Sequence, residues 1–126
     1  MVDILVVEDD PSWEKILRKT LEKAGYHVET VTTLRDAIDN LEMNSYQVVV
    51  TDIRLTEEVD NRDGIRLLEW IKKRELNTKN FAISGRPVSG LDKKRFKDEY
   101  KAVYIERLGF NNVEFIELIK KAIEGQ

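Results

Sequence analysis

Carboxylates follow two short apolar runs of the sequence, at the points where each run gives way to polar residues. The first run ends in Glu8 and Asp9, and the second, rich in β-branched residues, ends in Asp52. Runs of this length and composition predict strands covered on both faces of a parallel sheet. If the two strands are neighbours, their carboxylates converge in one crevice, where mutual repulsion and desolvation raise at least one pKa.

A divalent cation would relieve this repulsion. Mg²⁺ prefers oxygen ligands in octahedral geometry and keeps positions for water and a substrate phosphate, which suits a site of two carboxylates plus one further ligand. The alternative is that Glu8, Asp9 and Asp52 are solvated strand ends. Asp10 stands directly before Pro11, so we predict that it caps the N-terminus of the following helix.

Two hydrophobic periods alternate along the chain and predict five strands and five helices. Short apolar runs predict strands at residues 3–7, 27–31, 47–51, 80–84 and 102–105. Apolar residues three and four positions apart predict helices at 11–24, 34–41, 65–71, 91–100 and 113–123, with the weakest period in 91–100. This strict alternation predicts an α/β fold, a (βα)5 three-layer sandwich with right-handed crossovers. In such sheets ligands bind at the carboxyl ends of the strands.

Composition limits the class of protein. The 126 residues, 41% of them hydrophobic, suit one domain over residues 1–126, and no repeat or linker divides them. The chain has no cysteine, no signal peptide and no apolar run long enough to cross a membrane, so we expect a soluble, cytoplasmic protein. Its formal charge of −3 argues against direct nucleic-acid binding. We expect the basic run at 93–97 to be a solvated helix face.

From Asp3 to about Glu124 the chain resembles the receiver domain of two-component response regulators, in a chemotaxis-receiver-like but atypical form. ILVVEDDP at 4–11 is similar to the family's opening strand and acidic pair, and VVVTDIRL at 48–55 to its third strand. Asp63-Gly64 resembles the dipeptide that opens its third helix. The resemblance implies a flavodoxin-like fold, with a five-stranded parallel sheet of order 2-1-3-4-5.

The resemblance also implies roles for particular residues. The implied ligands of Mg²⁺ are Glu8, Asp9, Asp52 and the backbone carbonyl of Arg54. Asp52 is the implied phosphoacceptor, since a carboxylate can attack phosphorus to give an aspartyl-phosphate. Ser84 matches the position whose hydroxyl donates to a phosphoryl oxygen, and Tyr104 the aromatic position coupled to it as a switch, although core packing explains Tyr104 equally well. Such a protein catalyses its own phosphorylation and dephosphorylation but is not a turnover enzyme.

Three segments depart from the family's pattern. Arg107 and Leu108 stand where the family has Lys-Pro. We expect a trans peptide bond there, because a cis bond without proline costs about 3 to 4 kcal/mol, and Arg107 stays a candidate partner of the phosphate. The loop of residues 53–63 is four residues longer than usual, and forms either a partner-specific flap or a solvated loop. Arg86 is a candidate substitute for the missing lysine.

The resemblance implies a receiver in a phosphorelay, which accepts a phosphoryl group on Asp52 and switches a partner-binding surface on the fourth helix, fifth strand and fifth helix. The implied partners are a sensor histidine kinase or phosphotransfer protein and a downstream protein, without a membrane. The chain stops after the fifth helix, so we expect either a single-domain receiver or part of a longer protein. The competing hypothesis is a phosphorylation-independent interaction module. Arg107, Leu108 and the altered loop favour it, whereas the intact set of Glu8, Asp9, Asp52 and Ser84 opposes it. We also predict that Mg²⁺ changes the fluorescence of Trp13.

Overall fold

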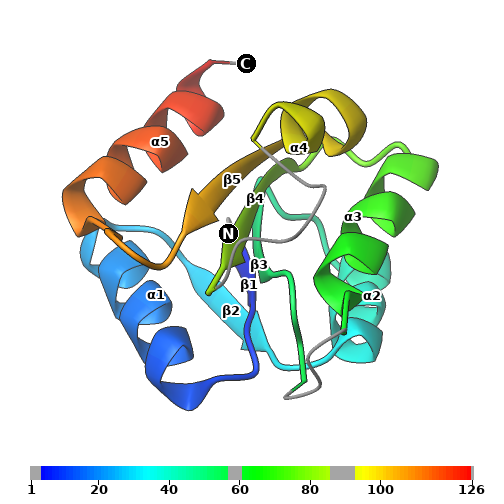
Figure 1. Ribbon diagram of the computed structural model, residues 1–126, viewed down its shortest axis with the longest axis horizontal. Helices are drawn as coiled ribbons and strands as arrows, with labels where there is room; N and C mark the ends of the chain where they lie inside the picture. The colour runs from blue at the N-terminus through cyan, green and yellow to red at the C-terminus, as the bar shows by residue number, and fades with distance from the viewer. Residues whose placement is uncertain (1–3, 57–60, 86–92, 126) are drawn as a thin grey trace.

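The computed structural model describes residues 4–56, 61–85 and 93–125 and contains a five-stranded parallel sheet of order β2-β1-β3-β4-β5. The strands are β1 (Ile4–Val7), β2 (Val28–Val31), β3 (Val48–Asp52), β4 (Lys79–Ser84) and β5 (Ala102–Glu106). The helices are α1 (Pro11–Lys23), α2 (Leu34–Met43), α3 (Asp63–Lys73), α4 (Lys93–Tyr100) and α5 (Asn112–Glu124). Helices α1 and α5 cover one face of the sheet, and α2, α3 and α4 lie on the other (Figure 1). The predicted (βα)5 sandwich and its strand order are therefore confirmed.

Strand β3, at the centre of the sheet, and its neighbour β1 are buried on both faces. Their alternate side chains point to opposite sides of the sheet, because successive residues of a strand do so. Val48 and Val50 join the core beneath α1 and α5, which includes Phe115, whereas Val49 joins the core beneath α2 and α3, which includes Leu67. This double burial explains why both strands appear in the sequence as continuous apolar runs.

The sheet brings the ends of β1 and β3 together. The two strands pair directly, with Val7 opposite Thr51, so the residues that follow β1 lie beside the last residue of β3. The strand order also reverses here, because β2 lies on one side of β1 and β3 on the other. In an open parallel sheet this is the point where a crevice forms outside the carboxyl ends of the strands.

The helix that follows β1 begins as the sequence predicts. The carboxylate of Asp10 accepts hydrogen bonds from the backbone N–H groups of Ser12 at 2.8 Å and Trp13 at 3.4 Å. These bonds satisfy donors that the first turn of a helix leaves free. Asp10 is therefore the N-cap of α1, and its carboxylate is engaged by the first turn of this helix.

Gly64 determines where α3 begins. Its backbone N–H donates to the carbonyl of Ile53 at 2.9 Å, which holds the first turn of α3 against the end of β3. A Cβ at position 64 would lie 1.9 Å from the carbonyl oxygen of Asp52, so the close approach requires glycine. The predicted opening of the third helix at Asp63-Gly64 is confirmed, and it ties that helix to the backbone of Asp52.

Helix α4 is held by one large side chain. The basic run at 93–97 lies within it, and Lys94 and Lys97 are exposed, as expected for a solvated face. Phe96 is fully buried and stacks on Tyr104 of β5 with ring centroids 5.0 Å apart. The helix begins at Lys93, and the two residues before it, which the sequence predicts as helical, lie outside the described residues.

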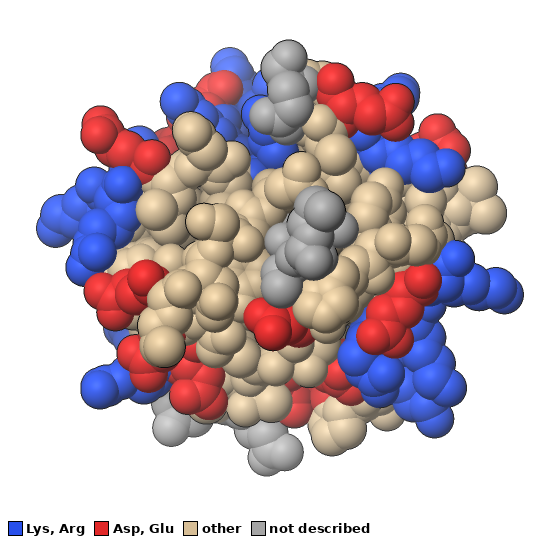
Figure 2. All heavy atoms as spheres, turned by 180° about the vertical axis from the view of Figure 1, so that it is seen from behind, with Lys and Arg blue, Asp and Glu red and all other residues tan. Residues whose placement is uncertain are grey.

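Charged side chains of both signs share the surface. On the face turned away from the viewer of Figure 1, both acidic and basic side chains lie around the rim, and uncharged residues make up much of the middle (Figure 2). That face thus has no continuous basic surface in the described part of the chain. Among the described helices, none combines the length and apolar character that a membrane crossing requires.

Candidate functional site

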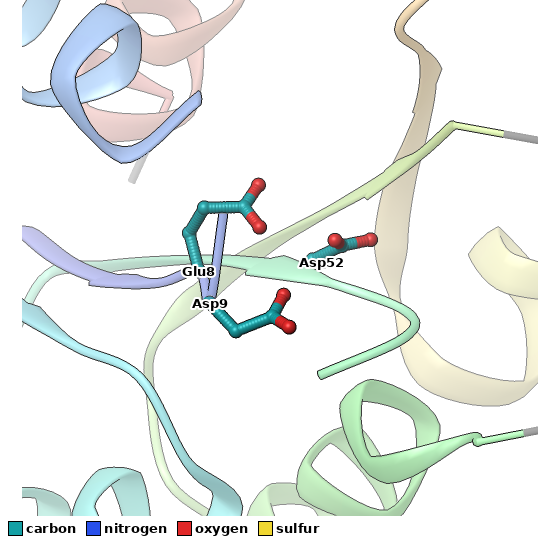
Figure 3. A group of neighbouring side chains, drawn as sticks. All are labelled: Glu8, Asp9 and Asp52. Carbon is teal, nitrogen blue, oxygen red and sulfur yellow. The ribbon is translucent and has the colours of Figure 1, made fainter. Parts of the chain in front are cut away.

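Three carboxylates meet where β1 and β3 end. One oxygen from each of Glu8, Asp9 and Asp52 lies within 4.8 Å of the others, and the three side chains project into the same space (Figure 3). Glu8 is 1% exposed and Asp52 is 7% exposed, whereas Asp9 is partly open to solvent. The structure thus brings together the three acidic residues that the sequence predicts to converge. Their roles as ligands or phosphoacceptor are taken up below as proposals.

Burial raises the pKa values of Glu8 and Asp52. The pKa of Glu8 rises from 4.5 to about 8, first because the carboxyl is desolvated and then because Asp52 is negative, while Arg107 and the backbone N–H of Asp10 oppose the rise. The pKa of Asp52 is also raised, mainly by burial, against the lowering effect of Arg107. The predicted rise of at least one pKa is confirmed. Desolvation is the largest cause of the rise for both residues.

Arg107 is the cation that the chain itself supplies. Its Nη2 donates to Oδ2 of Asp52 at 2.8 Å and also to Oε1 of Glu8. The guanidinium carbon lies 4.9 Å from the centre of the Trp13 ring, over its face. The peptide bond between Arg107 and Leu108 is trans, as predicted. The side chain of Arg107 thus reaches the acidic site from a trans peptide bond, without the cis bond that a following proline would allow.

The other predicted site residues lie on β3, β4 and β5. The backbone N–H of Arg54 donates to Oδ1 of Asp52 at 3.3 Å, which places this residue beside the acidic cluster. Ser84 is buried at the end of β4, where it pairs with Glu106 of β5. Tyr104, two residues before Glu106, is also buried. Because Tyr104 stacks on Phe96, core packing accounts for its inward position. Arg86 and most of the acidic loop residues, at 57–60, lie outside the described residues.

Sequence reasoning missed the aromatic partners of Arg107. Phe110 meets Trp13 edge-on, with ring centroids 5.3 Å apart. The backbone N–H of Phe110 donates to the carbonyl of Arg107 at 3.0 Å, in a turn that includes Gly109 at φ +80°. Trp13 is therefore contacted by both ends of this turn. The glycine is a signal of a tight turn, but no pattern in the sequence pairs residues so far apart.

Comparison with known proteins identifies the family. Residues 4–99 match the family model of the response regulator receiver domain. The receiver protein CpdR of Brucella abortus is 34% identical over 85 residues, which are 68% of this chain and 68% of that protein. The chain therefore belongs to the response regulator receiver family, whose members are signalling domains of two-component systems and generally not turnover enzymes.

Two further comparisons define how far the likeness extends. The rice two-component response regulator ORR26 (Oryza sativa subsp. japonica) is 41% identical over 70 residues, 54% of this chain but only 11% of that protein. The response regulator TrrA of Thermotoga maritima, solved in complex with Mg(2+)-BeF, superposes with a TM-score of 0.77 at 24% identity, covering 97% of this chain and 99% of that one. The likeness to TrrA shows the fold. The match to ORR26 covers only about a tenth of that longer protein.

Proposed function

We propose that this protein accepts a phosphoryl group on Asp52 and so relays a signal, with residues 1–126 acting as a single cytoplasmic receiver domain. The observation that carries the proposal is the convergence of Asp52 with Glu8 and Asp9 within 4.8 Å, at the carboxyl ends of two adjacent strands. Membership of the receiver family supports it. The complex of TrrA with Mg(2+)-BeF adds support from a protein of the same fold.

The donor set fits Mg²⁺. Carboxylate oxygens are the ligands that this ion prefers, and three of them lie within 4.8 Å of one another at this site. We propose Glu8, Asp9, Asp52 and the backbone carbonyl of Arg54 as its ligands. When bound, Mg²⁺ would neutralise charge on the carboxylates and on the incoming phosphoryl oxygens.

The residues of the chain supply the nucleophile and its orientation. An oxygen of Asp52 attacks the phosphorus of the donor, forming a new P–O bond as the bond between phosphorus and the donor's leaving atom breaks. The N–H of Arg54 orients the attacking carboxylate by donating to its Oδ1. In the proposed product, the hydroxyl of Ser84 donates to a phosphoryl oxygen. Hydrolysis of this acyl phosphate by water would regenerate Asp52.

The proposed signal leaves through the surface formed by α4, β5 and α5. Movement of Ser84 towards the phosphoryl group would alter the packing of Tyr104, which is now stacked on Phe96 of α4. Val103, the neighbour of Tyr104, is 41% exposed on this surface. We propose a sensor histidine kinase or phosphotransfer protein as the source of the phosphoryl group and a protein as the downstream partner. Direct binding to nucleic acid or a membrane is not part of the proposal.

Binding of beryllofluoride tests this function against the alternative of a phosphorylation-independent module. Beryllofluoride stands in for a phosphoryl group on a carboxylate, so its binding should require both Mg²⁺ and Asp52. We expect a saturable calorimetric titration with the unaltered protein and none with Asp52→Ala. The exposed Asp39→Ala, on α2, is the control and should bind like the unaltered protein. Equal heats from the unaltered protein and Asp52→Ala would reject the phosphoacceptor role of Asp52.

A further inference from the structure

Arg107 contacts two of the three acidic side chains proposed as metal ligands. A single nitrogen, Nη2, donates to both Glu8 and Asp52, so the two buried acidic side chains share one guanidinium. A divalent cation bound by the same carboxylates would compete with this contact, because cation and guanidinium both depend on the Glu8 and Asp52 side chains. The chain therefore contains an internal competitor for its own proposed metal site.

The contact between Arg107 and the carboxylates is incomplete. Arginine pairs most strongly with carboxylates through two parallel N–H bonds, yet here only Nη2 is engaged with them. The Nε of Arg107 is buried and has no hydrogen-bond partner among the described residues. An unsatisfied buried donor is unfavourable, so hydrogen bonding alone does not explain why the side chain adopts this position.

Trp13 supplies the missing constraint. The guanidinium lies 4.9 Å from the centre of the ring, within the range in which an aromatic face attracts a cation. The ring is fixed in turn by Phe110, which meets its edge at 5.3 Å, and by the first turn of α1, which Asp10 caps. Both ends of the turn between β5 and α5 therefore contact one ring.

We propose that Trp13 is a positioning residue for Arg107: its ring holds the guanidinium as an internal counter-ion of Glu8 and Asp52, and a divalent cation entering the site displaces it. This inference rests on the proposed function, because it concerns the same metal site. It adds that the affinity for the cation is set partly by an aromatic residue that touches neither the metal nor the phosphoryl group. It also gives Mg²⁺ binding an optical signal at Trp13.

Two substitutions test the proposal by calorimetric titration with Mg²⁺. Arg107→Gln removes the competing charge and should tighten binding about tenfold, as expected for loss of a hydrogen bond to a charged group. Trp13→Leu keeps every charge but removes the aromatic face, and should tighten binding about threefold. The matched control is Arg74→Gln, because Arg74 lies over Trp70 at the same distance of 4.9 Å but on α3, and it should leave the affinity unchanged.

The fluorescence of Trp13 distinguishes a positioning role from a purely structural one, because a structural role would leave its emission unchanged when Mg²⁺ binds. The chain has two tryptophans, so Trp70→Phe leaves Trp13 as the only indole. In this background Mg²⁺ should change the emission of Trp13 with the same midpoint as the calorimetric titration. Adding Arg107→Gln should abolish that change while Mg²⁺ still binds, because the ring then has no guanidinium to lose.

The outcomes separate this inference from the proposed function. If Mg²⁺ binds but neither Trp13→Leu nor Arg107→Gln tightens binding, the positioning role is wrong and the metal site stands. If none of the proteins binds Mg²⁺, both proposals fail. If Arg107→Gln does not fold, Trp13→Leu still decides, because it retains the ion pairs, and an unchanged affinity in that protein overturns the inference.

Discussion

Replacing Glu8 by glutamine should remove much of the pH dependence of folding. Glu8 is 1% exposed, and desolvation together with the charge of Asp52 raises its pKa from 4.5 to about 8. Between these two values the folded protein retains a proton that the unfolded chain has lost. Stability rises with pH only where the unfolded state binds more protons. The contribution of Glu8 therefore falls as the pH rises through this window, and changes no further above it.

The size of the effect follows from the width of the window. The interval from 4.5 to about 8 corresponds to roughly 5 kcal/mol of unfolding free energy, at about 1.4 kcal/mol for each pH unit. This is an upper bound, because the pKa of Asp52 is raised too and interacting carboxyls titrate as a pair. We expect that Glu8→Gln removes about half of it, on the order of 2 to 3 kcal/mol.

Urea denaturation in the presence of a chelator measures this difference. The free energy of unfolding of the unaltered protein and of Glu8→Gln would be determined at roughly pH 5 and pH 8.5 by linear extrapolation. The unaltered protein should lose more stability between the two pH values than Glu8→Gln does. Glu117→Gln, at an exposed position of α5, should keep the unaltered profile. Parallel profiles for the unaltered protein and Glu8→Gln would refute the assignment of a raised pKa to Glu8.

Three further predictions concern the same region. The apparent affinity for Mg²⁺ should rise with pH up to about 8, because a carboxylate ligand must lose its proton; a titration series that is flat from pH 6 to 8 would contradict the raised pKa of Glu8. Gly64→Ala should destabilise the protein by about 2 kcal/mol or more through overpacking, because the new Cβ would lie 1.9 Å from the carbonyl oxygen of Asp52. Gly85→Ala is the control, since a Cβ there meets only ordinary contacts at 3.5 Å. Equal melting temperatures for the two variants would contradict this prediction. Asp10→Ala should cost about 1 kcal/mol through loss of the N-cap and leave Mg²⁺ affinity unchanged; a large loss of affinity would make Asp10 part of the metal site.

The sequence was most informative where burial is complete. Strands β1 and β3 have apolar residues on both faces, so their position in the middle of a parallel sheet follows from composition. The carboxylates that end them are then placed by topology, because parallel strands finish at one edge. Gly64 could be predicted as a helix start, but not its approach to Asp52, since that distance depends on how α3 crosses the sheet.

The position of the Arg107 side chain could not be predicted from patterns in the sequence. Its side chain meets Glu8 after β1, Asp52 at the end of β3 and Trp13 on α1, so it depends on three elements and on one rotamer. Helix α4 was also weakly signalled, because a single buried aromatic residue, Phe96, anchors an otherwise polar segment. In both cases the decisive contact is a single tertiary contact. Hydrophobic periodicity in the sequence reveals only a face that is buried at regular intervals.

Intact-mass measurement after incubation with a small acyl phosphate and Mg²⁺ tests the central proposal most directly. The unaltered protein should gain the mass of one phosphoryl group, and Asp52→Ala should gain none, while Asp39→Ala should behave like the unaltered protein. An unmodified mass for the unaltered protein with several donors, or a gain of equal size by Asp52→Ala, would contradict the assignment of Asp52 as the phosphoacceptor.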